Sequence, residues 1–119
     1  EAGDVFVLTR GADTCIAAYP LNEWKRYEER YASMNQFDEK KRFFLRTVLA
    51  WSEETELDAQ QRITISKRFL EFAELEGKAT IVGMLDHLEI WNPERFDRYL
   101  QIGSESYETI AEEAMKTND

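Results

Sequence analysis

Cysteine and histidine are almost missing from this chain of 119 residues, which contains one of each. Because Cys15 is the single cysteine, no disulfide can form within one chain and no cysteine cage can hold a metal. His87 has no second histidine or cysteine near it in an expected strand, so a metal or catalytic role is not predicted. Cys15 is expected to be a small core residue, and its isolation fits a reducing cytoplasm.

Long apolar runs and glycine-rich phosphate loops are also absent. No stretch approaches the roughly 20 apolar residues of a membrane-spanning helix, and no basic leader precedes the first expected strand, so we expect a soluble chain without membrane contact. No nucleophile lies beside a base, and the carboxylates lie on acidic helix faces. We therefore expect no enzymatic activity, no cofactor and no bound metal. The length allows one compact domain or two small halves that share a core.

Positive charge is scarce, since the formal net charge is −9. This balance weighs against a generic nucleic-acid binder, because phosphate contacts depend on Lys and Arg. The basic residues nevertheless cluster, whereas much of the acidity lies in the tail. One cluster, beside Asp38 and Glu39, is more often a solvated helix face than a phosphate-binding patch. The clusters are Lys40, Lys41, Arg42 and Arg46, then Arg62, Lys67 and Arg68.

A strand-turn-helix pattern is written twice in this sequence. Strands over residues 5–9 and 14–19 form the first expected hairpin, and strands over residues 79–84 and 87–91 form the second. The copies align Asp13 with Asp86 and Tyr19 with Trp91 at nearly one offset. The segment 57–65 precedes the second copy, and its counterpart is expected to lie before Glu1. We therefore expect a duplicated unit that begins partway through its first copy.

Helix signals lie between and after the hairpins. Apolar residues at spacings of three and four predict helices after each hairpin and in the segment between them. The segment from Arg62 to Ile65 alternates like a strand, and Gly77 and Gly103 are expected to end helices. Short strands alternating with helices predict an α+β fold. The expected helix starts are Pro20, Asp38, Ser66, Asn92 with Pro93, and Ser104 or Ser106.

An ordered set of motifs carries a family resemblance from Val5 to about Tyr99. The motifs are Phe6-Val-Leu-Thr-Arg-Gly11 with Asp13, Tyr19-Pro-Leu21 with Trp24, a Phe-rich second helix, Asp58-x-x-x-Arg62, Gly83, and Glu89-Ile-Trp91. This set resembles the MraZ family of bacterial transcriptional regulators. The resemblance implies tandem AbrB-like swapped-hairpin β-barrel halves with flanking helices, related by a pseudo-twofold repeat. We expect residues 1–52 to form an N-terminally incomplete first repeat and residues 53–119 to form the second with a C-terminal helix.

The same resemblance implies a DNA-binding transcriptional regulator located in the cytoplasm at the nucleoid. It implies a homo-oligomer, assembled as a ring, that binds repeated sites in promoter DNA, including the promoter of its own division and cell-wall gene cluster. Members of the family carry an Asp-x-x-x-Arg segment in each half, and here the first is absent. The second lacks the glycine often found just before the arginine. The alternative function is a non-enzymatic ring or interaction protein without direct DNA contact.

Asp58 and Arg62 are the main candidate DNA-binding residues. Four residues apart across a tight turn, the carboxylate can accept turn amides or pair with the guanidinium and orient it. A guanidinium held in this way can reach phosphate oxygens or the O6 and N7 of guanine. Gln60 and Gln61 at the turn tip can add base-edge or phosphate contacts. The alternative is that Asp58 and Arg62 only close a hairpin as an exposed ion pair of little energetic value.

Overall fold

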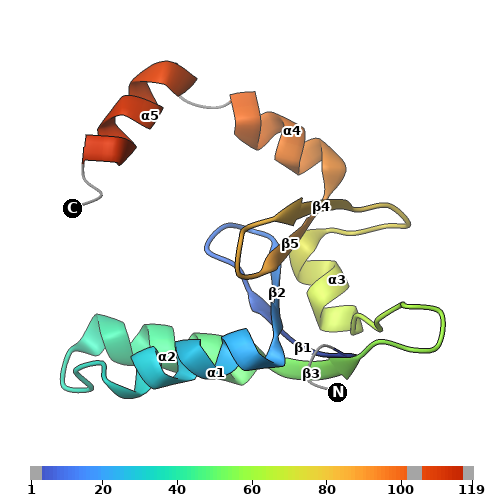
Figure 1. Cartoon of the computed structure of the whole chain (residues 1–119), viewed down its shortest axis with the longest axis horizontal. Helices are drawn as coiled ribbons and strands as arrows, with labels where there is room; N and C mark the ends of the chain where they lie inside the picture. The colour runs from blue at the N-terminus through green and yellow to red at the C-terminus, as the bar shows by residue number, and fades with distance from the viewer. Residues whose placement is uncertain (1–3, 102–105, 117–119) are drawn as a thin grey trace.

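The computed structural model describes residues 4–101 and 106–116, and it confirms the predicted α+β class (Figure 1). The described strands form one antiparallel sheet in the order β3-β1-β2-β5-β4. In Figure 1, α1 and α2 run side by side at the lower left, next to β1 and β3, whereas α4 and α5 follow β5 at the top. In chain order the elements are β1 (Val5–Arg10), β2 (Ile16–Pro20), α1 (Leu21–Ala32), α2 (Glu39–Trp51), β3 (Glu53–Glu56), α3 (Lys67–Ala73), β4 (Thr80–Gly83), β5 (Leu88–Trp91), α4 (Pro93–Gln101) and α5 (Tyr107–Lys116).

The two predicted hairpins are confirmed as β1–β2 and β4–β5. They meet through their second strands, because β2 pairs with β5 in a register that sets Ile16 opposite Ile90. Within the described residues, β3 and β4 remain as the two edges of an open sheet. Closure into a swapped barrel, and the division into residues 1–52 and 53–119, stay predictions.

The strand β3 was not predicted from the sequence. It pairs with β1 in a register that sets Glu53 opposite Leu8 and Glu56 opposite Val5. Just beyond it, the Leu57 N–H donates to the Asp4 carbonyl at 2.9 Å. Pairing with β1 therefore anchors the chain at the sheet edge immediately before Asp58.

The sheet carries a hydrophobic cluster on each face. Because successive strand residues point to opposite faces, Leu8 of β1 belongs to one cluster and Val7 to the other. The first cluster is covered by Phe69 and Ala73 of α3, and the second by Trp24 of α1 and Val48 of α2. The buried Thr9 hydroxyl donates to the Val48 carbonyl at 3.0 Å, which ties β1 to α2. Helices thus pack on both faces of β1, and β1 in turn pairs with β3.

Three predicted helix caps are confirmed by hydrogen bonds. The Asp38 carboxylate accepts from the Lys41 N–H at 3.0 Å, and the Asn92 side-chain oxygen accepts from the Arg95 N–H at 3.0 Å. The Ser106 hydroxyl accepts from the Thr109 N–H at 3.2 Å. These bonds satisfy amide groups that helices leave unpaired at their starts. The expected positions of Gly103 and Ser104 lie outside the described residues.

The predicted cap and end of the short helix α3 need correction. Ser66 stands at its start, but the Ser66 hydroxyl donates to Glu53 Oε2 at 3.3 Å instead of capping the helix. The helix ends at Ala73, and Glu74 takes the left-handed conformation with a φ of 55°. Gly77, with a φ of 80°, lies beyond this point in the connection to β4.

The predicted strand from Arg62 to Ile65 is wrong, because these residues form no ladder with another strand in the described structure. The Thr55 hydroxyl donates to the Thr64 carbonyl at 3.3 Å across this segment. Ile63 and Ile65 pack against the cluster that contains Leu8. One-sided burial therefore accounts for the alternating pattern without a strand. No helix within residues 4–101 and 106–116 combines the length and apolar character needed to cross a membrane.

Candidate nucleic-acid interface

The predicted turn from Asp58 to Arg62 is present and links β3 to the segment that leads into α3. Its backbone closes twice, because the Asp58 N–H donates to the Arg62 carbonyl at 2.8 Å and the Gln61 N–H donates to the Asp58 carbonyl at 3.0 Å. Gln61 has a φ of 65°, in the left-handed region that favours glycine. Gln61 stands where the family pattern has glycine, and it adopts a backbone conformation that is typical of glycine.

The Asp58 carboxylate stabilises this turn through hydrogen bonds to residues of the turn itself. Its Oδ1 accepts hydrogen bonds from the N–H groups of Gln60 and Arg62, each at 2.9 Å. Its Oδ2 accepts from Arg62 Nε at 3.2 Å. The Arg62 amide, followed by the Gln60 amide and the guanidinium, lowers the pKa of Asp58 below its usual value. The carboxylate is thus charged at neutral pH and fixes the backbone and the arginine together.

The Arg62 guanidinium is oriented and still open to solvent. Besides Asp58 at Nε, it donates through Nη2 to the Gln60 side-chain oxygen at 2.6 Å. The Arg62 side chain nevertheless keeps 71% of its surface exposed. Gln60 uses its carbonyl oxygen for this contact, so its two amide hydrogens remain as donors. The turn therefore brings Asp58, Gln60 and Arg62 into one hydrogen-bonded group, with the exposed Gln61 beside it.

The charge around this turn is not strongly positive. Asp58 offsets Arg62, and Glu54 and Glu56 of the adjacent β3 are exposed. Lys67, which is 87% exposed, lies 4.0 Å from Glu71 of its own helix. A single turn with this balance offers oriented donors but little long-range attraction for phosphate.

Arg68, grouped in the sequence with the basic residues near Asp58, holds three elements together. Its Nε lies 2.8 Å from Glu53 Oε2, and its Nη2 donates to the Ala50 and Trp51 carbonyls at 3.3 and 3.2 Å. Its guanidinium also lies 4.6 Å from the centre of the Trp51 ring. Arg68 therefore joins α3 to β3 and to the end of α2.

The basic residues of α2 lie away from the turn. Figure 1 places the start of α2 and the turn after β3 at opposite ends of the molecule. Lys40, Lys41 and Arg46 are exposed, and Arg42 donates to the Gln36 carbonyl at 2.9 Å. The structure does not gather the two basic clusters into one surface.

Cys15 lies in the core, and His87 packs against neighbouring side chains of the fold. Cys15 is fully buried, which confirms its expected core position, and burial together with Glu89 and Asp13 raises the pKa of its thiol to about 12. His87 lies with Nδ1 2.7 Å from Asp86 Oδ1, and its ring stacks on Tyr19 at 4.5 Å. Among the described residues, no group of three His, Cys, Asp or Glu side chains is arranged to hold a metal.

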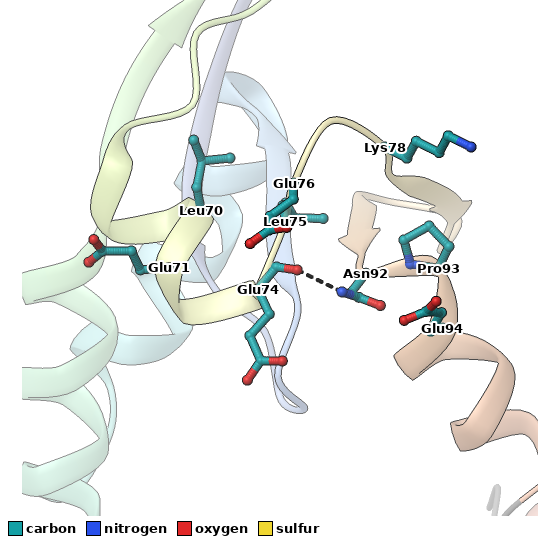
Figure 2. A pocket seen from close by; sticks show the side chains of 9 residues that line it. All are labelled: Leu70, Glu71, Glu74, Leu75, Glu76, Lys78, Asn92, Pro93 and Glu94. Atoms are coloured by element: carbon teal, nitrogen blue, oxygen red, sulfur yellow. Dashed lines mark hydrogen bonds between the residues drawn. The ribbon is translucent and has the colours of Figure 1, made fainter.

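A cavity of about 820 Å³ lies between α3 and the start of α4 and does not include the turn (Figure 2). Asn92 donates to the Glu74 carbonyl across it at 2.6 Å. Its many carboxylates repel phosphate, which makes it unsuitable as a nucleic-acid site. Its lining residues are Leu70, Glu71, Glu74, Leu75, Glu76, Lys78, Asn92, Pro93 and Glu94.

Comparison with known proteins gives consistent relatives. A family model described as "MraZ protein, putative antitoxin-like" matches residues 1–47 and 49–118 of this chain. The transcriptional regulator MraZ of Natranaerobius thermophilus is 41% identical over 111 residues, which cover 93% of this chain and 78% of that protein. The transcriptional regulator MraZ of Halothermothrix orenii is 39% identical over 111 residues, with coverages of 93% and 78%.

Proposed function

This chain belongs to the MraZ family, and we propose that it is a sequence-specific DNA-binding regulator of transcription. The observation that carries the proposal is the exposed Arg62 guanidinium, held in one orientation by Asp58 and Gln60. A planar donor group fixed in this way matches a phosphate or the O6 and N7 edge of guanine. The names of the relatives support a role in transcription and give no indication of an enzyme.

Each residue of the turn has a distinct proposed role. Arg62 contacts the DNA, and Asp58 orients Arg62 by binding both its backbone and its side chain. Gln60 supports the guanidinium with its oxygen and offers its amide hydrogens to a base edge or phosphate. Gln61, exposed at the tip, adds a further contact. We propose that the DNA is promoter DNA with repeated sites, including the promoter of the protein's own division and cell-wall gene cluster.

The proposed active form is a homo-oligomeric ring in the cytoplasm at the nucleoid. A net charge of −9 and the glutamates of β3 make one turn a weak DNA ligand. Several turns that engage repeated sites together raise the overall affinity without any new contact. Repeated sites and repeated subunits therefore compensate for the acidity of each chain.

We also propose that residues 1–52 and 53–119 are two AbrB-like repeats related by a pseudo-twofold axis. The four hairpin strands lie in the order β1-β2-β5-β4. From either end of this order, the first strand of a hairpin comes before its second strand, so the arrangement is symmetric. The central pairing of β2 with β5 is antiparallel, as a twofold axis between them requires. β3, from the second repeat, adds to the hairpin of the first, which supports an exchange of strands between repeats.

A second candidate function is a non-enzymatic ring or interaction protein that does not touch DNA. It is favoured by Phe37 and Phe43, which are 94% and 72% exposed on the α2 side of the molecule. Exposed apolar surface of this kind marks protein contacts. Both functions require an oligomer. They differ in whether the protein binds DNA through Arg62.

The test is electrophoretic retardation of a promoter fragment with repeats by the wild-type chain, Arg62→Ala and the control Arg46→Ala. Arg46 is an exposed arginine of α2, so both variants lose one positive charge. We expect Arg62→Ala to lower the affinity by roughly tenfold or more per engaged site and to reduce the salt dependence, because one contact per subunit is lost. Arg46→Ala should bind like the wild type.

Equal weakening by both variants would assign the effect to net charge and refute the specific role of Arg62. Wild-type protein that forms rings but retards no promoter DNA would favour the second function. Circular dichroism must show that Arg62→Ala is folded, and its exposed position predicts that it is.

A further inference from the structure

A second cavity, of about 460 Å³, is open to solvent between the β1–β2 loop, α3 and α4. Its size falls within the range of about 300–1,000 Å³ that small-molecule sites occupy. Three arginines and three aromatic residues contribute to its wall, together with one carboxylate. The lining residues are Arg10, Gly11, Ala12, Asp13, Thr14, Phe72, Trp91, Arg95, Arg98 and Tyr99. In a chain with a net charge of −9, this wall has a local excess of positive charge.

The arginines of this cavity are poorly neutralised by the protein. The Arg10 guanidinium lies over the rings of Phe72 and Trp51, at 4.3 and 5.3 Å, and forms no hydrogen bond or ion pair with a described residue. The guanidinium of Arg98, which is exposed on α4, likewise forms none within residues 4–101 and 106–116. Guanidinium groups left with free donors are suited to bind phosphate in a bidentate manner.

Arg95 adds a third positive charge to the wall of the cavity. Its Nη1 is 3.7 Å from Glu74 Oε2, and this buried nitrogen has no hydrogen-bond partner among the described residues. Buried donors without partners are uncommon in folded proteins. Arg95 therefore has one ion-pair partner and a free buried donor, whereas the guanidinium groups of Arg10 and Arg98 have no ion-pair partner among the described residues.

The aromatic residues provide a flat surface beside the cations. Trp91 is almost fully buried and packs against Tyr99, with ring centres 5.3 Å apart. Tyr99, which also lines the cavity, keeps 49% of its surface exposed. An exposed aromatic ring next to guanidinium groups is the combination that binds a base by stacking and its phosphates by charge.

We propose that this cavity binds a free nucleotide, a nucleoside that carries one or more phosphates. The phosphates lie against Arg10 and Arg98, and the base stacks on Tyr99. Duplex DNA is disfavoured as the occupant, because its bases are paired and stacked and do not enter a concave site. This site is separate from the Asp58 turn and does not depend on the proposed DNA binding.

The test is isothermal titration of the wild-type chain with ADP, GDP, CDP and UDP, and with adenosine as the ligand without phosphate. The proposal predicts a dissociation constant below 1 mM (roughly −4 kcal/mol or tighter) for at least one nucleoside diphosphate and no measurable binding of adenosine. Arg98→Gln should weaken binding at least tenfold. The matched control Arg46→Gln, which removes an exposed arginine of α2, should leave it unchanged.

Tyr99→Leu separates the two halves of the proposed site. It should weaken nucleotide binding while leaving pyrophosphate binding intact. Absence of binding for all four diphosphates by the folded wild type, or equal affinity in Arg98→Gln, would overturn the proposal. Loss of promoter retardation in Arg98→Gln without any nucleotide binding would also overturn it and assign Arg98 to a DNA phosphate. Failure of the Arg62 experiment leaves this result unaffected, since the two use different residues.

Discussion

Gln61 occupies a backbone conformation that residues other than glycine rarely adopt, with a φ of 65°. We predict that Gln61→Gly raises the free energy of unfolding by about 0.5–1 kcal/mol, because glycine has no steric penalty in this region. Urea denaturation measures the change. Ala59→Gly, in the same turn but without a positive φ, is the control and should lower the stability instead. A loss of stability in Gln61→Gly would show that its side chain stabilises the turn.

Arg68 is the residue whose role could least be inferred from its charge. We predict that Arg68→Gln lowers the free energy of unfolding by about 1–2 kcal/mol, since it removes the ion pair with Glu53 and the ring contact with Trp51. Chemical denaturation compares it with Lys67→Gln, the neighbouring lysine, which is 87% exposed and should cost little. Equal losses in the two variants would contradict a specific structural role for Arg68.

These residues also show what could be predicted locally. The bond between Asp58 and Arg62 was expected, because both partners lie in one short turn where spacing alone limits the geometry. The partners of Arg68 lie 15 to 18 residues earlier in the chain, and no local pattern indicates which cation reaches them. Gln60 was expected to face the DNA, and the structure adds that its oxygen first supports Arg62.

At the scale of elements, one contact joins α1 to the β4–β5 hairpin. The Tyr27 hydroxyl donates to Asp86 Oδ2 at 2.8 Å, and His87 Nδ1 lies 2.7 Å from Asp86 Oδ1. The His87 hydrogen bond, followed by that of Tyr27, lowers the pKa of Asp86. The charged Asp86 side chain therefore links α1 to the β4–β5 hairpin.

This contact predicts a pH-dependent part of the stability. A depressed pKa in the folded state contributes stability above the unfolded pKa, which is about 4 for aspartate, and that contribution is lost as pH falls through the folded value. Asp86→Asn should therefore be less stable than the wild type at pH 6–7. This difference in the free energy of unfolding should disappear at acidic pH. Denaturation curves between about pH 3 and 7 measure this difference. A stability difference for Asp86→Asn that stays constant across this pH range would refute the role of its charge.

Hairpins and caps were predictable because turn residues and capping side chains act within a few positions. β3 was not, since Glu53–Glu56 has no apolar alternation and becomes a strand only by pairing with β1, more than 40 residues earlier. Ile63 and Ile65 show the converse error. They alternate as strand residues do, yet burial against the Leu8 cluster occurs without a neighbouring strand.

At the scale of the whole molecule, the exposed apolar residues of the α2 side remain without cover in a single chain. Phe44 packs against Tyr31 of α1, with ring centres 5.6 Å apart, whereas Phe43 is 72% exposed. Phe37, just before the helix, is 94% exposed. Large apolar side chains that a single chain leaves this exposed are expected at protein contacts rather than in solvent. The proposed ring provides such contacts, and α2 is the face that we expect to supply them.

We predict that Phe43→Glu lowers the oligomer mass while the subunit stays folded, because a charge at a buried subunit contact is costly but harmless at an exposed position. Analytical ultracentrifugation measures the mass, and circular dichroism measures the fold. Lys40→Gln is the matched control, since it lies on the same helix, is exposed and also makes the net charge more negative by one. An unchanged mass in Phe43→Glu would exclude this face from the assembly. If the mass of Phe43→Glu is reduced, this variant should also retard promoter DNA less than Lys40→Gln does. Separated subunits lose the increase in affinity that comes from several linked turns.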